Sequence, residues 1–169
     1  MAEPAHRIVD EPLAGKAAKP VPVILLVDDD EMTRISMAGR LKRLGYRVIE
    51  ADDGVAGLAA IRAQRPDLVI LDWMMPGLDG PSVCEAIRAD GELRSSQVVL
   101  MTAHDQPEQI AEGLSRGADD FLSKAASKQE VLARVQASLR SNALVREIER
   151  TRDDLDRSHR LLSAKQAEL

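Results

Sequence analysis

Cysteine, aromatic residues and long hydrophobic runs are scarce in this chain, and each scarcity excludes a class of protein. One cysteine, Cys84, is present in 169 residues, so no internal disulfide framework can form. Its helical spacing from Ile87 favours a buried thiol over a reactive one. Aromatic residues make up 2% of the chain, so the core must be aliphatic. The N-terminus has no long apolar segment, and we expect a cytoplasmic protein that makes no membrane contact.

Acidic and basic residues are unevenly distributed along the chain. Residues 21–124 carry 18 acids and 11 bases, whereas residues 125–169 carry seven acids and nine bases. A basic groove with interleaved aromatic residues does not occur, which argues against direct binding of nucleic acid. The slight basic excess of the last segment is typical of a solvated helix face.

Apolar runs alternate with helical periodicities along residues 22–140. Apolar runs with β-branched members predict buried strands of a parallel sheet. The predicted strands are 23–28, 46–50, 68–72, 97–101 and 120–123. The predicted helices are 31–44, 55–64, 81–89, 107–116 and one that starts at the capping-box pattern of Ser127 and Glu130. Five strands that alternate with five helices predict a doubly wound α/β domain.

The two ends of the chain depart from this alternation. Residues 1–21 are rich in proline and have no periodicity, which predicts a disordered leader. No glycine follows Gly117 and no proline follows Pro107, so nothing in the sequence stops the last helix before its end. We therefore expect residues 141–169 to extend this helix beyond the domain as a linker.

This extension has a heptad pattern with an apolar and a polar half. The apolar positions that recur every seven residues are Ile148, Leu155, Leu162 and Leu169, with Leu144 and Val145 at the start. The companion positions are polar: Thr151, Ser158 and Lys165. The pattern predicts a weak parallel coiled coil, and the alternative is an isolated or frayed tail.

Charged residues follow three of the predicted strands. Asp28, Asp29 and Asp30 follow the first, Asp72 ends the third and Lys124 follows the fifth. In open α/β sheets, ligands collect beyond the carboxyl ends of the strands, so these residues should meet there. Bare carboxylates at such a distance raise one another's pKa, and a divalent cation removes the conflict. Oxygen ligands suit Mg²⁺, which also binds phosphate oxygens.

Together these motifs resemble the receiver domain of response regulators in two-component signal transduction, of the chemotaxis-regulator type. The resemblance covers about residues 22–140. The motifs that carry it are the acidic triplet at 28–30, the loop Asp72-Trp73-Met74-Met75-Pro76-Gly77-Leu78-Asp79-Gly80, the segment Met101-Thr102-Ala103, and Lys124. It implies a flavodoxin-like fold of strand order 2-1-3-4-5 and phosphorylation of an aspartate by a histidine kinase or a histidine phosphotransfer protein.

Carried over by position, the resemblance assigns a role to each residue of the acidic pocket. Asp72 would be the phosphoacceptor, and Lys124 would contact the phosphoryl oxygens. Asp29, Asp72 and the backbone carbonyl of Met74 would bind Mg²⁺ or Mn²⁺, with Asp28 holding the metal through water. Asp30 and Glu31 are better explained as the start of the first helix, where acidic residues are favoured.

Further positions would transmit or tune the signal. Thr102 would turn its hydroxyl toward the phosphorylated aspartate, and Phe121 would change rotamer with it, although core packing explains Phe121 almost as well. Met74 could screen the phosphoryl group from water and slow its hydrolysis. His104 could also tune this lifetime, but a solvated loop histidine is the simpler explanation.

One position departs from the family pattern. The family's lysine is usually followed by proline in a cis bond, whereas Ala125 follows Lys124. A cis peptide before a residue other than proline costs about 2.5–4 kcal/mol. The loop after Lys124 should therefore turn differently or store strain.

The resulting prediction is a receiver that is not a turnover enzyme. Phosphorylation would alter the surface formed by the fourth helix, fifth strand and fifth helix, and with it homodimerisation through that surface and the C-terminal helix. The sequence is also compatible with two alternatives. One is an interaction module that works without phosphorylation, and the other is a phosphatase of the haloacid-dehalogenase type, which would leave the Asp72 loop unexplained.

Overall fold

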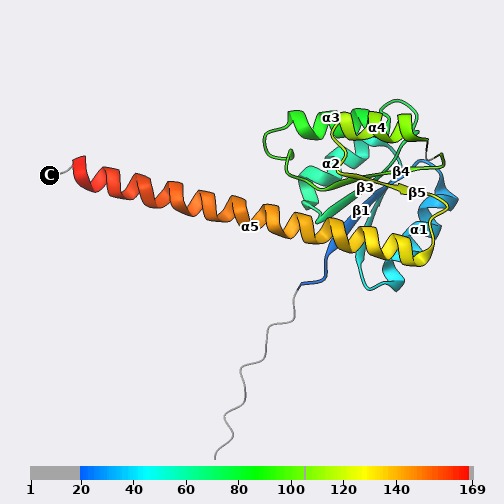
Figure 1. Ribbon diagram of the computed structural model, residues 1–169, viewed down its shortest axis with the longest axis horizontal. Helices are drawn as coiled ribbons and strands as arrows, with labels where there is room; N and C mark the ends of the chain where they lie inside the picture. Colours follow the sequence, from blue (N-terminus) through cyan, green and yellow to red (C-terminus); the bar gives the residue numbers. More distant parts are fainter. Residues whose placement is uncertain (1–19, 105, 168–169) are drawn as a thin grey trace, which may run out of the picture.

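In the computed structural model, which describes residues 20–104 and 106–167, five parallel strands form one sheet between two layers of helices (Figure 1). The strands are β1 Val23–Val27, β2 Arg47–Ala51, β3 Leu68–Asp72, β4 Val98–Thr102 and β5 Asp120–Ser123. Their spatial order is β2-β1-β3-β4-β5, with every pair parallel. The predicted fold class and strand order are confirmed, and the strand boundaries agree with the predicted ones to within one residue.

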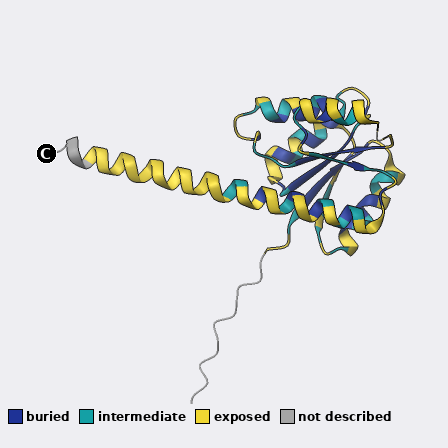
Figure 2. Ribbon diagram, in the orientation of Figure 1, coloured by how far each residue is buried: buried dark blue, intermediate teal, exposed yellow. Residues whose placement is uncertain are grey.

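Five helices connect the strands and cover both faces of the sheet. They are α1 Glu31–Arg43, α2 Gly54–Gln64, α3 Gly80–Ala89, α4 Pro107–Ser115 and α5 Lys128–Ala167. Helices α1 and α5 share one apolar cluster with one face of the sheet, and α2 and α3 share a second cluster with the other face. This two-sided cover explains why every residue of β3 and β4 is buried (Figure 2).

Aliphatic side chains fill both clusters, as the lack of aromatic residues predicts. Ile24, Leu26 and Ile70 point to the α1/α5 side, while Leu25 and Leu71 point to the α2/α3 side. Cys84 is fully buried, and burial raises the pKa of its thiol to about 12, so the expected structural role of this residue is confirmed.

Helix α5 is one continuous helix of 40 residues, as the absence of glycine and proline predicts. At ~1.5 Å per residue its length is about 60 Å, so it extends far beyond the sheet (Figure 1). Val131 and Val135 pack on the sheet, whereas every side chain from Glu147 to 164 is exposed. Most of the predicted leader, residues 1–19, lies outside the described residues. So does Leu169, the last residue of the heptad pattern.

A polar clamp fixes the point at which α5 leaves the domain. Arg146 donates from Nη1 to Oδ1 of Asp67 at 2.6 Å and from Nη2 to the carbonyl oxygen of Pro66 at 3.1 Å. The other carboxylate oxygen of Asp67 accepts a hydrogen bond from the backbone N–H of Val23 at 2.7 Å. The clamp thus joins α5 to the amino ends of β1 and β3, six residues beyond the domain boundary predicted at 140.

Candidate phosphorylation site

Three carboxylates from two neighbouring strands meet at the carboxyl end of the sheet. Asp28 and Asp29 follow β1, and Asp72 is the last residue of β3, which pairs with β1 in parallel. Oxygen atoms of the three side chains all lie within 4.8 Å of one another. Asp28 and Asp72 are buried, whereas Asp29 is exposed at the mouth of the pocket.

Lys124 is the cation that faces these carboxylates. Its Nζ lies 2.9 Å from Oδ1 of Asp72 and 3.0 Å from Oδ2 of Asp28. The contact with Asp28 is close but lacks hydrogen-bond alignment, so Oδ2 of Asp28 is buried without a hydrogen bond among the described residues. One lysine cannot neutralise three carboxylates, and the pocket keeps an excess of negative charge.

This excess and the burial of Asp72 appear in its pKa. The pKa of Asp72 is raised from 3.8 to about 6. Burial is the main cause, Lys124 opposes it, and the negative charges of Asp28 and Asp29 add to it. The pKa of the Lys124 ammonium is also raised: its burial lowers the pKa, but the close carboxylates of Asp72 and Asp28 raise it by more. The pocket therefore favours an added positive charge.

Local sequence features hold the acidic residues in place. Asp30 caps α1, with Oδ1 accepting from the backbone N–H of Thr33 at 2.7 Å, and this bond lowers the pKa of Asp30. The expected capping role of Asp30 is thereby confirmed. Oδ1 of Asp28 accepts from the N–H of Asp30 at 2.9 Å, and Arg34 donates to the carbonyl oxygen of Asp28 at 2.7 Å.

The loop after Asp72 folds back onto the start of α3. Asp79 caps this helix by accepting from the N–H of Ser82 at 2.8 Å, and the N–H of Gly80 donates to the carbonyl oxygen of Trp73 at 3.0 Å. A side chain at Gly80 would collide with the carbonyl oxygen of Asp72. The glycine thus lets the loop approach closely, and this brings Met74 to the rim of the pocket. Its side chain is 74% exposed and lines a surface hollow with Asp29.

Thr102 lies at the carboxyl end of β4, next to β3 in the sheet, and its hydroxyl is already engaged. Oγ1 donates to the carbonyl oxygen of His104 at 2.8 Å, accepts from the N–H of His104 at 3.1 Å, and lies 3.3 Å from Oε1 of Gln109 in α4. The His104 contacts are made by its backbone. Gln109 was not identified from the sequence, because its place beside Thr102 depends on how α4 packs.

Phe121 is half-buried in β5, and its ring is covered by Arg134, a residue that was not predicted from the sequence. The guanidinium of Arg134 in α5 stands 4.8 Å from the centroid of the Phe121 ring. Nη1 of Arg134 donates to both carboxylate oxygens of Asp120, at 3.0 and 3.1 Å. On its inner side the ring borders a small pocket that Thr102 and Trp73 also line.

The loop after Lys124 contains no cis peptide bond, although Ala125 stands where the family usually has proline. Every described peptide bond is trans, including the one between Lys124 and Ala125. The N–H of Lys124 donates to the carbonyl oxygen of Thr102 at 2.8 Å, and the N–H of Ala125 donates to Oγ of Ser123 at 3.2 Å. The loop thus turns differently from the family pattern and still places Nζ of Lys124 between Asp28 and Asp72.

This fold and this pocket match those of a known family. Residues 24–136 match the response regulator receiver domain, so the chain belongs to the response regulator receiver family. As a receiver domain it is not a turnover enzyme, which confirms the prediction and excludes the haloacid-dehalogenase alternative. Among the described residues, no helix is long and apolar enough to cross a membrane.

Named relatives support the assignment. Over 121 residues the chain is 43% identical to the response regulator MprA of Mycobacterium ulcerans, covering 72% of this chain and 51% of that protein. Over 120 residues it is 40% identical to the transcriptional regulatory protein AfsQ1 of Streptomyces coelicolor, covering 71% and 52%. The chain spans about half the length of these curated relatives.

Solved structures show the same fold. The receiver domain of NarL from Mycobacterium tuberculosis superimposes with a TM-score of 0.65 at 35% identity, covering 71% of this chain and 97% of that one. The chemotaxis protein CheY4 of Vibrio cholerae gives a TM-score of 0.66 at 28% identity, covering 70% and 99%.

Proposed function

We propose that Asp72 is the residue phosphorylated by a histidine kinase or a histidine phosphotransfer protein. The single observation that carries this assignment is the cluster of Asp28, Asp29 and Asp72, whose oxygens lie within 4.8 Å and which Lys124 only partly neutralises. Asp72 is the member that ends a fully buried strand, and its Oδ1 lies 2.9 Å from the Nζ of Lys124.

The donor set fits a hard divalent cation, Mg²⁺ or Mn²⁺. Asp29 and Asp72 would be direct ligands, together with the backbone carbonyl of Met74, and Asp28 would hold the ion through water. Oδ2 of Asp28 supports this, because it is buried with an ion pair to Lys124 at 3.0 Å but without a hydrogen bond, which a metal-bound water would supply. When bound, the ion would neutralise charge on the carboxylates and on the phosphoryl oxygens.

Phosphoryl transfer then needs placement and charge neutralisation more than a strong nucleophile. A carboxylate oxygen of Asp72 forms a bond to phosphorus as the bond from phosphorus to the donor's imidazole nitrogen breaks, and the electron pair stays with the imidazole. The ammonium group of Lys124, which lies 2.9 Å from Asp72, would then form an ion pair with the phosphoryl oxygens. Met74 at the exposed rim would limit the approach of water to the product.

The phosphoryl group would be read through Thr102 and Phe121. To reach it, the Thr102 hydroxyl must leave His104 and Gln109, and this links the pocket to α4. The ring of Phe121 could then enter the small pocket beside Thr102, which would break its contact with Arg134 in α5. These steps would alter the α4/β5/α5 surface and promote homodimerisation through it and through the C-terminal helix.

The alternative of a module that works without phosphorylation would not require this pocket. Such a module could lose the buried charges of Asp28 and Asp72, whose retention costs folding energy. The domain boundaries predicted at 21 and 140 stay proposals.

Trp73 gives a direct test, because it neighbours Asp72 and is the only tryptophan in the chain. Mg²⁺ should change its fluorescence, and beryllofluoride, which mimics a phosphoryl group, should change it again. In Asp72→Asn the second change should vanish, while the exposed control Asp52→Asn should keep both. A beryllofluoride response that survives Asp72→Asn would refute the assignment.

A further inference from the structure

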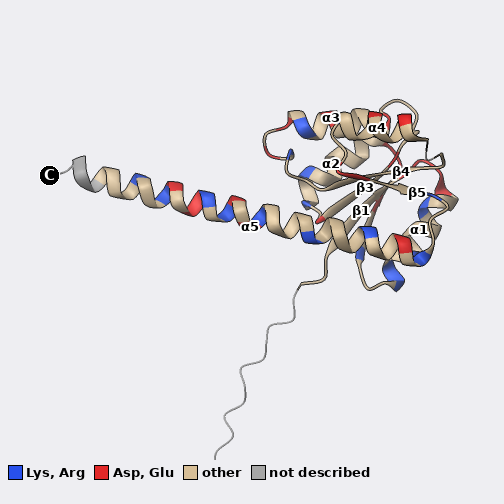
Figure 3. Ribbon diagram, in the orientation of Figure 1, with Lys and Arg blue, Asp and Glu red and all other residues tan. Residues whose placement is uncertain are grey.

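The part of α5 that leaves the domain carries a stripe of exposed apolar side chains. Leu144, Ile148, Leu155 and Leu162 are 61%, 68%, 65% and 63% exposed, on a helix whose other exposed residues are mostly charged (Figure 3). Thr151 and Ser158 complete the stripe, which is called the seam below. Burying leucine and isoleucine side chains away from water lowers the free energy, so a seam of this length favours association with an apolar surface.

The seam points away from the domain on which α5 packs. Asn142 marks the domain side, since it is 4% exposed and lies one turn before the Arg146 clamp. At ~100° per residue, Leu144 and Leu162 lie about 200° around the helix from Asn142, Leu155 about 220° and Ile148 about 240°. The domain cannot cover the seam, and a second helix can approach it without displacing the domain.

Seam residues are spaced alternately by four and three positions, an average of 3.5. This period produces a left-handed coiled coil, in which Ile148, Leu155 and Leu162 take the a positions and Leu144, Thr151 and Ser158 the d positions. Polar d positions weaken such a contact, so the association should be reversible.

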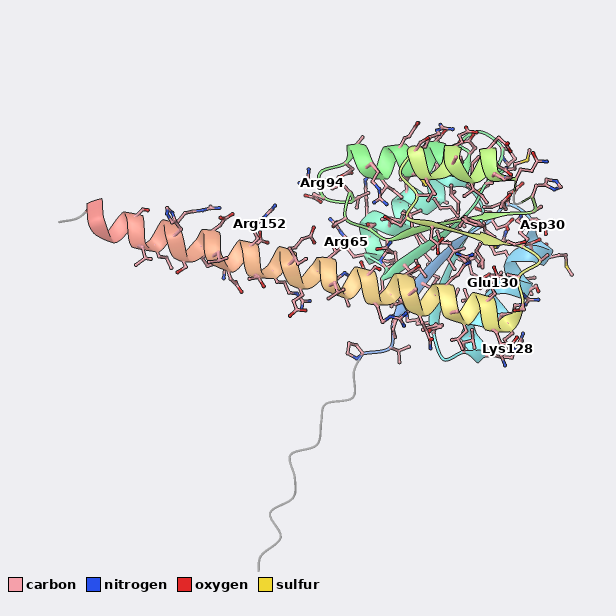
Figure 4. All side chains as sticks on the ribbon, viewed as in Figure 1. Asp30, Arg65, Arg94, Lys128, Glu130 and Arg152 are labelled. Carbon is pink, nitrogen blue, oxygen red and sulfur yellow. The ribbon has the colours of Figure 1, made fainter. Side chains whose placement is uncertain are left out.

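Charges beside the seam indicate what covers it. Glu147 and Asp154 flank it on one side at g positions, and Arg152 and His159 flank it on the other at e positions. In a parallel pair of identical helices in register, each g residue faces the e residue five positions later on the other helix. Glu147 then meets the second copy's Arg152, and Asp154 meets the second copy's His159. Arg152 projects freely from this part of α5 (Figure 4).

An antiparallel pair would have the opposite electrostatics. There, g positions face g positions and e positions face e positions. When residues 144–162 overlap fully, Asp154 faces the second copy's Asp154 and Arg152 faces the second copy's Arg152. Glu147 faces only Leu161 and His159 only Val145, so no attraction offsets these two repulsions. We propose that the seam binds a second copy of this chain as a parallel, in-register, two-stranded coiled coil over residues 144–162. This specifies the helix contact within the proposed function, and it does not require phosphorylation.

Cysteine cross-linking tests orientation and register together. Thr151→Cys and Ser158→Cys, made separately, should each form a disulfide-linked dimer with oxidised glutathione, since identical d positions face each other only in a parallel pair in register. The unmodified chain is the control, because Cys84 is fully buried. In an antiparallel pair at most one variant could cross-link. Cross-linking of only one variant, or of neither, would overturn the proposal.

Charge reversal tests the flanking pairs in the full chain. Glu147→Arg or Arg152→Glu alone should weaken dimerisation about tenfold in sedimentation equilibrium, because each changes two symmetric attractions into repulsions. The double variant should recover the original affinity. Asp153→Arg, on the domain side of the helix, should change it little. Single variants that dimerise as well as or better than the unmodified chain would overturn the parallel pairing.

The Trp73 response to beryllofluoride in the same variants separates the two proposals. A normal response in a variant that fails to dimerise leaves the phosphorylation site intact and reports on the seam alone. Loss of that response in Asp72→Asn, with cross-linking of Thr151→Cys retained, would report on the pocket alone.

Discussion

Removing the negative charge of Asp72 should stabilise the metal-free protein at neutral pH. Asp72 is 4% exposed and shares its pocket with two further carboxylates, against one lysine. The isosteric change Asp72→Asn keeps the shape of the side chain and removes its charge. A site built for function thus costs folding energy until its ligands arrive.

The pKa of Asp72 gives the size and the sign of the effect. Because burial and the neighbouring acids raise this pKa from 3.8 to about 6, the folded protein binds the proton more tightly than the unfolded chain does. The contribution of Asp72 to wild-type stability is therefore fully present below pH 3.8 and is lost as the pH rises through about 6. The difference corresponds to about 3 kcal/mol at neutral pH, which is the upper end of the gain expected for Asp72→Asn.

Urea unfolding in the presence of a chelator measures this gain. The free energy of unfolding of Asp72→Asn should exceed that of the wild type at pH 7.5 by about 1–3 kcal/mol. The excess should shrink at pH 5 and vanish near pH 4. Asp52→Asn removes an exposed carboxylate and should change little at any pH. A variant that is less stable than the wild type at pH 7.5, or an excess that does not depend on pH, would refute the reasoning.

Three further outcomes follow from the same geometry. Mg²⁺ should raise the melting temperature of the wild type more than that of Asp72→Asn, and equal shifts would speak against a metal at the acidic cluster. Met74→Asn should make the phosphoryl group on Asp72 hydrolyse several-fold faster, since the methionine no longer limits the approach of water. An unchanged lifetime of the phosphoryl group would show that Met74 does not screen it. Arg146→Met should lower the free energy of unfolding by about 1 kcal/mol by breaking the clamp to Asp67. The exposed control Arg150→Met should not, and equal losses would reject the clamp.

Most of the fold could be predicted from the apolar runs that form the strands and from the residues that end or fail to end the helices. Apolar runs such as Leu68–Asp72 are buried on both faces, so composition alone identifies them. The length of α5 followed from the absence of glycine and proline after Gly117, and α5 runs unbroken to Ala167. Because parallel strands end at one edge, the meeting of Asp28, Asp29 and Asp72 was also predictable, and their oxygens do converge.

Contacts between side chains far apart in sequence could not be predicted. Arg146 and Asp67 are 79 positions apart, and nothing in either segment signals the partner. Gln109 reaches Thr102 only because α4 packs above β4, and Arg134 stacks on Phe121 only because α5 crosses β5. Each of these pairs depends on the tertiary packing, which local patterns do not determine.

Transfer of a phosphoryl group to Asp72 is the claim on which the account depends. The most direct test is intact-mass spectrometry after incubation with a small phosphoryl donor such as phosphoramidate and Mg²⁺, followed by peptide mapping. We expect one added phosphoryl group per chain, located at Asp72, absent in Asp72→Asn and absent when Mg²⁺ is chelated. Modification that persists in Asp72→Asn, or that maps to another residue, would contradict it.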